Sequence, residues 1–365
     1  MARQCQHRRT RRIYSEALTF ENLMGAWHTV LHTCQNKRGL YEFAMFEQAR
    51  VMKLLETLQR REYWPNKYRC FMIFEPKPRL VMSQSINDKT VNHFVAKHYL
   101  LPLLERTLID TNVATRKDKG AKYAKKMIQR YISQMEAKSP GAPIYALKVD
   151  VSKYFYTIDH EILFKMLERR IKDRDIIEIL RRIVGETNRP YINAVVDGFN
   201  HYYGTDIPHY QHNKGLSIGA MTSQFLAIYY LNDVDHLLKE REGCQYYIRY
   251  MDDLLIFGHD AGELKWVWQV VEEEFAKLKL TVNPKSAIYN VTSSAGVPFL
   301  GYRYYVDEKR RLRVRCLAHT MRRVRRRLSV LKNKDVEKYE RSKASYKGYF
   351  MNELRARGLE RWAKM

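Results

Sequence analysis

Apolar residues recur at two different spacings along the chain, and these spacings predict helices that alternate with short strands. From Leu40 to Gln59 they follow the period of an amphipathic helix, and from Lys67 to Glu75 they become strand-like and end before Pro76. Helical spacing returns over residues 88–104 and 121–135. The front of the chain is therefore predicted to be helical and to lead into a sheet.

The second half of the chain is predicted to contain the main strands. Residues 144–151 form an apolar strand, and Asp159 is placed to cap the helix that follows. A turn and one long helix are expected over 215–238, and residues 245–257 read as a hairpin with Asp252 and Asp253 at its tip. Beyond it we expect a helix over 261–280, strands near 288, over 299–306 and over 312–316, and basic helices in the last fifty residues. No repeat or long linker intervenes, so one continuous body with lobes, of the mixed α/β class, is expected.

The charge of the chain points to a polyanionic partner. Lysine and arginine number 65 against 40 acidic residues, a formal net charge of +25, and they gather in the first twelve residues and between Lys309 and Arg327. A generally basic surface is the alternative. Nucleic acid is favoured over a membrane, because no stretch reaches the roughly 18 uninterrupted apolar residues of a spanning helix. A cytoplasmic location is expected, with an organellar presequence as the competing interpretation of the Arg-rich start. The five scattered cysteines indicate neither a disulfide framework nor a zinc site.

Three carboxylates in apolar surroundings are the candidate chemistry. Asp252 and Asp253 interrupt two strands that are otherwise suited to burial, and a water-exposed turn would explain them equally well. Asp150 favours a functional explanation over a simple turn, because it is a third acid that closes an apolar strand and is followed by more aromatic residues. Divalent cations held by carboxylates and substrate phosphates give all three acids one explanation.

Six segments, taken in order, resemble motifs of the reverse transcriptase family. Tyr250-Met-Asp-Asp253 is similar to the family's signature tetrapeptide, and Leu147–Phe155 resembles its first catalytic motif. The others are Glu75–Arg79 of the fingers, Gly215–Gln224 of the middle motif, Leu280–Lys285 near the triphosphate and Phe299–Tyr302 of the primer grip. Several motifs in the right order, over roughly residues 65–305, make the resemblance specific.

The resemblance implies a right-hand polymerase with fingers, a palm of antiparallel sheet backed by helices, and a helical thumb. We expect a basic helical extension over 1–65, fingers over 66–143, a palm over 144–305 with a fingers insertion at about 172–214, and a basic thumb over 306–365.

The resemblance also implies RNA-directed DNA synthesis by two-metal phosphoryl transfer. Asp150 and Asp252 would hold both Mg²⁺ ions, for which Mn²⁺ can substitute, with the carbonyl of Val151 assisting. Asp253 would be a less essential third carboxylate. Lys285 would be a general acid toward pyrophosphate or, equally, a plain phosphate contact.

Substrate contacts are implied by the same motifs. Phe155 falls at the steric gate against a ribose 2′-hydroxyl, so dNTPs are the expected substrates; a core phenylalanine is the alternative. The triphosphate would contact Lys77, Arg79 and Lys153, each of which is otherwise a solvated surface charge. Gly219, Ser223 and Gln224 would line the nucleotide and template, and a helix-entry turn is the alternative for Gly219. Nucleic acid would contact Arg116 in the fingers, Tyr250 and Met251, Gly301 and Tyr302, and Arg322 and Arg326 in the thumb. A solvated loop is the alternative for Arg116.

Two residues indicate the subclass. Many family members have glutamine and proline where this chain has Ile218 and Gln224, and the form found here resembles bacterial enzymes of diversity-generating retroelements and of phage defence. Such enzymes imply a structured template RNA, an RNA/DNA duplex, and an accessory protein or homo-oligomer as partners. The competing hypothesis is an RNA-binding scaffold or regulator that retains the polymerase fold.

Overall fold

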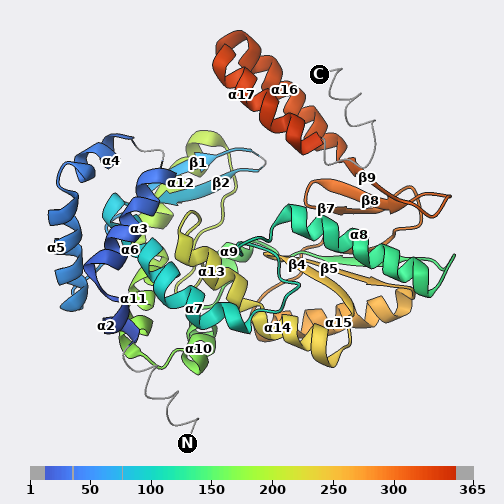
Figure 1. Cartoon of the computed structure of the whole chain (residues 1–365), viewed down its shortest axis with the longest axis horizontal. Helices are drawn as coiled ribbons and strands as arrows, with labels where there is room; N and C mark the ends of the chain where they lie inside the picture. The colour runs from blue at the N-terminus through green and yellow to red at the C-terminus, as the bar shows by residue number, and fades with distance from the viewer. Residues whose placement is uncertain (1–12, 35–36, 76, 351–365) are drawn as a thin grey trace, which may run out of the picture. The chain divides into compact units, whose positions relative to one another are not determined.

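The computed structural model describes residues 13–34, 37–75 and 77–350, and these residues form two compact units (Figure 1). Unit 1 contains the described residues within Met1–Thr115, Val151–Leu237 and Glu272–Val282. Unit 2 contains those within Arg116–Asp150, Leu238–Val271 and Asn283–Met365. The chain therefore passes between the units several times, and each unit is built from segments that are distant in sequence. The arginine-rich first dozen residues lie outside the described part of the chain.

Unit 1 is mainly helical. Its first part contains α2 (Ile13–Ala17), α3 (Phe20–Thr33), α4 (Lys37–Ala44), α5 (Glu47–Gln59), α6 (Ile86–Val95), the π-helical η2 (Ala96–Leu100), α7 (Leu101–Leu104) and η3 (Glu105–Thr107). Its second part contains α9 (Tyr154–Thr157), α10 (His160–Arg170), α11 (Arg174–Val184), η4 (Gly185–Asn188), α12 (Pro190–Tyr203), α13 (Met221–Tyr230) and α14 (Asn232–His236). The π-helical η5 (Leu237–Arg241) and α15 (Ala261–Lys277) each contribute residues to both units.

Two helices that the sequence pattern predicts as continuous are broken in the structure. The pattern from Leu40 to Gln59 is divided between α4 and α5, because Phe46 has φ −135° and ψ 36°, which is not helical. The predicted long helix that ends at Leu238 stops first at Leu231, whose φ of −97° and ψ of 10° end α13. Apolar periodicity continues across both breaks, so it does not reveal them.

The predicted cap at Asp159 is confirmed. Its carboxylate accepts a hydrogen bond from Ile162 N at 3.1 Å, and its second oxygen pairs with Lys279 Nζ at 2.7 Å. Burial alone would raise the pKa of Asp159, but these bonds favour the charged form and the net shift is downward. The cap fixes the start of α10 directly after the segment that contains Phe155.

A two-stranded hairpin in unit 1 consists of β1 (Arg69–Ile73) and β2 (Arg79–Ser83). Its inner face includes Leu80 and Met82, which join the apolar core formed with Ile192 and Val196 of α12. The outer face carries exposed residues that alternate with these, as expected for half-buried strands.

Unit 2 contains a four-stranded antiparallel sheet in the order β4-β5-β3-β6. Its strands are β3 (Tyr145–Val149), β4 (Tyr246–Tyr250), β5 (Asp253–Gly258) and β6 (Ala287–Asn290), and α8 (Ala121–Lys138) packs beside β4 (Figure 1). Tyr131 of α8 donates to the carbonyl of Tyr247 at 3.4 Å. β3 is thus a central strand with ladder partners on both sides.

The rest of unit 2 consists of a second sheet and two basic helices. β7 (Val297–Phe299), β8 (Tyr302–Val306) and β9 (Leu312–Cys316) form a three-stranded antiparallel sheet. They are followed by α16 (Ala318–Lys334) and α17 (Val336–Phe350), which pack against one another (Figure 1). Within the described ranges, no helix has both the length and the apolar character that a membrane span requires.

Candidate metal and nucleotide site

Asp252 lies in the two-residue turn of the β4–β5 hairpin, as the sequence predicts. Tyr250 pairs with Asp253 across the ladder, so Met251 and Asp252 form the turn. Met251 has φ +57°, the left-handed backbone that tight hairpins use at their first turn residue and that side chains other than glycine rarely adopt. The fully buried Arg249 donates from Nη1 to the carbonyl of Met251 at 2.7 Å, which holds this turn.

Asp150 comes directly after the last residue of β3, on the strand next to β5. Because Val149 is opposite Leu254 in the antiparallel ladder, the next position along β3 falls beside Asp253. The sheet therefore brings Asp150 to the hairpin that carries the other two acids. All three residues belong to unit 2.

The carboxylates influence one another strongly. The pKa of Asp252 is raised from 3.8 to about 7, first by burial and then by the negative charges of Asp150 and Asp253. A hydrogen bond between the carboxyl groups of Asp150 and Asp252 acts in the same direction. Asp253 differs from the other two, because Lys148 Nζ lies 3.3 Å from its Oδ1. A divalent cation would relieve the repulsion that remains between Asp150 and Asp252.

These acids fit a divalent cation that substrate oxygens help to hold. Across residues 13–34, 37–75 and 77–350, no three His, Cys, Asp or Glu side chains are arranged as a complete metal site. Magnesium typically takes one or two protein carboxylates and completes its shell with water and phosphate oxygens. The close pair of Asp150 and Asp252 meets that requirement, while Asp253 is paired with Lys148.

The remaining predicted residues of unit 2 lie on several elements. Lys285 is exposed and follows Asn283, to whose side chain it donates its main-chain N–H. Gly301, with φ +84°, and the buried Tyr302 lie at the β7–β8 turn. Arg322 and Arg326 are exposed on α16, and Arg116 is half-buried ahead of α8. Their predicted contacts with nucleic acid stay predictions.

In unit 1, Phe155 is held through its backbone. Its carbonyl accepts a hydrogen bond from Leu216 N at 2.7 Å, which links α9 to the middle motif. The ring is half-buried, and the neighbouring Lys153 is exposed with a left-handed φ of +50°. Val151 forms an isolated antiparallel bridge with Val282.

The middle motif lies against the β1–β2 hairpin within unit 1. Gly219 has φ +117°, and a Cβ there would be 3.1 Å from Val81 Cγ1 and 3.3 Å from the carbonyl of Met82, so this position has little room for a side chain. Ser223 is buried, and its hydroxyl is 3.1 Å from that of Ser217, whereas Gln224 is half-buried. Lys77 and Arg79 are both exposed on the hairpin.

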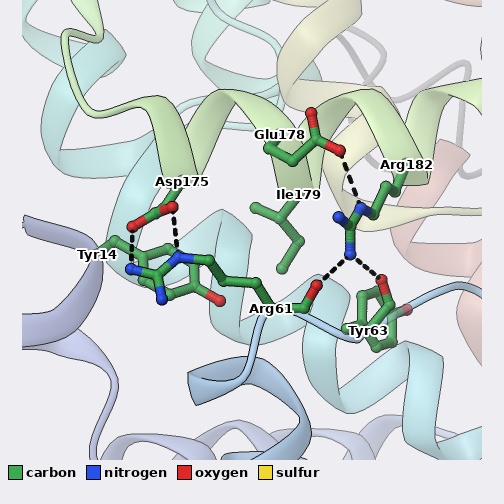
Figure 2. Close-up of a pocket in the computed structure, with 7 residues that line it drawn as sticks. All are labelled: Tyr14, Arg61, Tyr63, Asp175, Glu178, Ile179 and Arg182. Carbon is green, nitrogen blue, oxygen red and sulfur yellow. Dashed lines mark hydrogen bonds and ion pairs between the residues drawn. The ribbon is translucent and has the colours of Figure 1, made fainter.

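A small pocket in unit 1 contains none of the predicted site residues (Figure 2). Arg61 holds the carboxylate of Asp175 with two hydrogen bonds, at 2.6 and 2.7 Å. Arg182 donates to the carbonyls of Arg61 and Tyr63 at 2.5 and 3.0 Å. The remaining lining residues are Tyr14, Glu178 and Ile179. These contacts connect the end of α5 to α11, and we interpret the pocket as structural.

Four residues that support the acids or their turn were missed from the sequence: Lys148, Arg249, Asn283 and Ser286. Lys148 and Arg249 are charged residues inside apolar strands, which is a usable signal of a buried partner. Asn283 contacts Asp150, and its only signal is its place beside Pro284 and Lys285 in the motif that follows α15.

Comparison with known proteins establishes the family. The model of the family described as reverse transcriptase (RNA-dependent DNA polymerase) matches residues 74–304. This match covers more than half of the chain, so the protein belongs to the reverse transcriptase family and has its mixed fold of helices and antiparallel sheet. The family is one of RNA-directed DNA polymerases, which are nucleotidyltransferases.

Solved structures similar to this chain include two yeast telomerases. A telomerase from Candida albicans, solved with a fragment of telomeric RNA, is 13% identical with a TM-score of 0.47, over 67% of this chain and 46% of its own. An apo telomerase from Candida tropicalis is 14% identical with a TM-score of 0.47, over 66% and 47%. The chain thus spans about half the length of these telomerase chains. No curated protein matches the sequence.

Proposed function

We propose that the protein is an RNA-directed DNA polymerase that adds dNTPs to a primer on a structured RNA template. The observation that carries this proposal is the convergence of Asp150 on Asp252, which the register of β3 against β5 brings about. Burial, and then the charges of Asp150 and Asp253, raise the pKa of Asp252 to about 7. An ordinary surface turn would not bring a second acid from β3 to Asp252. Membership of the reverse transcriptase family supports the reaction class.

Each predicted residue has a definite task in this reaction. Asp150 and Asp252 would hold Mg²⁺, or Mn²⁺ in its place, which supplies charge neutralisation for in-line phosphoryl transfer. Lys77, Arg79 and Lys153 would bind the triphosphate through charge-assisted hydrogen bonds. Lys285 would donate a proton to, or simply bind, the departing pyrophosphate.

Selection of the sugar is assigned to Phe155. A ring at the edge of the nucleotide would collide with a 2′-hydroxyl, and the hydrogen bond from Leu216 N to the carbonyl of Phe155 fixes its backbone. Gly219, with little room for a side chain, would let the backbone approach the base pair. The substrates would therefore be dNTPs rather than NTPs.

Duplex binding is assigned to the helical region after β9. The part of α16 that carries Arg322 and Arg326 has exposed arginines opposite a buried stripe that includes Val324 and Leu328. Such a helix would bind phosphates without regard to sequence and with strong salt dependence.

We further propose a role in a bacterial diversity-generating retroelement or in defence against phages. Ile218 and Gln224 in the middle motif support this choice, because they depart from the glutamine and proline of many relatives. The enzyme would act in the cytoplasm on a dedicated RNA, with an accessory protein or as a homo-oligomer.

Primer extension with the full chain tests the proposed activity. Purified protein is given an RNA template with an annealed DNA primer, or its own co-purified RNA, together with dNTPs and Mg²⁺ or Mn²⁺. We expect incorporation that EDTA stops and that Asp252→Asn abolishes. Equal incorporation by Asp252→Asn, or none by the wild type on any template, would contradict the proposal. RNA binding and a biological effect that survive Asp252→Ala together with Asp253→Ala would favour the scaffold.

A further inference from the structure

We propose that Asn283 is a positioning residue that orients the carboxylate of Asp150 toward a divalent cation. This inference rests on the proposed function, because it concerns the same pair of acids. Asn283 Nδ2 donates to Asp150 Oδ2 at 3.0 Å, and the two residues are 133 positions apart in sequence. Both are half-buried and lie within unit 2.

The main chain fixes the two residues together. Asn283 N donates to the carbonyl of Asp150 at 2.7 Å, and Asp150 N donates to the hydroxyl of the buried Ser286 at 3.1 Å. Ser286 N in turn donates to the carbonyl of Asn283 at 2.9 Å, which closes a turn around Pro284. The segment Asn283–Ser286 therefore holds Asp150 at both its N–H and its C=O.

The orientation of the Asn283 amide follows from a third contact. Its Oδ1 accepts a hydrogen bond from Lys285 N at 3.0 Å, so the oxygen faces the turn and the NH₂ group faces Asp150. The reverse orientation would place Oδ1 against a carboxylate and the NH₂ group against an N–H. Both the NH₂ group and the carbonyl oxygen of the Asn283 side chain therefore make hydrogen bonds.

Asparagine combines features that other residues lack here. Aspartate could accept from Lys285 N but would repel Asp150, and alanine could do neither. Glutamine has an extra methylene, which would displace the amide from both partners. The donor engages one carboxylate oxygen of Asp150 and leaves the second for a cation. Such outer contacts to metal ligands typically contribute about 10- to 100-fold in metal affinity or activity.

The experiment compares Asn283→Ala with the control Asn290→Ala in the full chain. Asn290 is an exposed residue of unit 2 whose amide oxygen also accepts a local main-chain N–H, from Thr292 at 2.9 Å. Mn²⁺ binding to each protein is followed by electron paramagnetic resonance without nucleotide, and primer extension is measured over a range of Mg²⁺ concentrations.

For Asn283→Ala we expect weaker Mn²⁺ binding and a kcat about 10- to 100-fold lower at limiting Mg²⁺. Excess Mg²⁺ should restore part of the rate while KM for the dNTP stays near the wild-type value, and Asn290→Ala should match the wild type. Wild-type Mn²⁺ affinity in a folded Asn283→Ala protein would overturn the proposal.

The Asn283→Asp variant tests whether the side chain at position 283 acts as a hydrogen-bond donor to Asp150 or as a direct metal ligand. Because its carboxylate has no donor and also repels Asp150, this variant should be less active than Asn283→Ala at every Mg²⁺ concentration. Activity at or above the wild-type level would overturn the positioning role, since the side chain at 283 would then act as a ligand. Thermal unfolding identifies any variant that fails to fold, and the other variant then decides. Absence of polymerase activity in the wild-type protein would contradict the proposed function. The comparison of Mn²⁺ binding between the wild type and Asn283→Ala would still test the role of Asn283.

Discussion

Lys148 Nζ lies 3.3 Å from Asp253 Oδ1, and the two side chains are only 22% and 28% exposed. The pair runs diagonally between β3 and β5, because Lys148 is opposite Leu255 and Asp253 is two residues before it. The ammonium therefore compensates the charge of the third carboxylate. Asp150 and Asp252 are left as the pair whose charges a cation must neutralise.

This pairing predicts unequal effects of removing the acids. Asp150→Asn or Asp252→Asn should lower primer extension by more than about 100-fold, beyond the range of residues that only support a metal ligand. Asp253→Asn should lower it by at most about tenfold, a range in which such supporting contacts fall. Single-turnover extension rates at saturating Mg²⁺ measure this, and Lys148→Met serves as the control for the lost ion pair. Equal losses for Asp252→Asn and Asp253→Asn would contradict the ranking.

Replacement of Phe155 should change sugar selection. Phe155→Ala removes the ring proposed to meet the 2′-hydroxyl, so the ratio of kcat/KM for dATP to that for ATP should fall by about 10- to 100-fold, the range of steric discrimination in apolar pockets. Phe155→Tyr should keep the wild-type ratio, because it retains the ring. An unchanged ratio in a folded Phe155→Ala protein would assign the ring to the core instead.

His160 should make the folded state sensitive to acid. Burial lowers the pKa of His160, although its hydrogen bond to the carbonyl of Gly215, 2.7 Å from Nε2, and the charge of Asp159 oppose this shift. A folded-state pKa below the ordinary value means that the unfolded chain binds the proton more readily. This contribution to stability is complete above about pH 6.5, the ordinary histidine value, and is lost as the pH falls below it.

Urea unfolding at pH 7.5 and 5.5 tests this expectation. The free energy of unfolding of the wild type should decrease between these pH values, and His160→Gln should decrease less. The exposed His201 provides the matched control, because it is not among the groups that shift the pKa of His160, and His201→Gln should behave as the wild type does. If all three proteins show the same pH dependence, His160 is excluded as a cause of the change in the free energy of unfolding.

The arginines of α16 should set the salt dependence of duplex binding. Arg322→Ala and Arg326→Ala should each weaken binding to RNA/DNA duplexes of any sequence and reduce the slope of log K against log salt by about one. Fluorescence anisotropy between 50 and 300 mM KCl gives the slope. Arg38→Ala, on α4, controls for the change in total charge, and an equal change in that variant would point to general electrostatics.

The sequence predicted those parts of the fold and site that depend on local patterns. Asp252 at a hairpin tip, Asp150 at a strand end and the cap at Asp159 each follow from alternation or spacing within a dozen residues. The family match confirms the reverse transcriptase resemblance, whereas the individual roles of the site residues stay predictions.

Contacts between distant segments could not be predicted in the same way. Asn283 and Asp150 meet only because Val282 pairs with Val151 and thereby brings their segments together. The partner of Lys148 depends on the register of β3 against β5, which the sequence of either strand alone does not set. The break at Phe46 depends on a backbone conformation that apolar spacing does not encode.

The central place of β3 has a consequence for errors of folding. Its ladder with β5 and β6 aligns Lys148 with Leu255 on one side and with Ala287 on the other. A slip of one residue would turn every side chain of the strand to the opposite face. Asp150 would then point away from Asp252, so a molecule with this register error would be inactive. It would therefore add no miscopied DNA to the product.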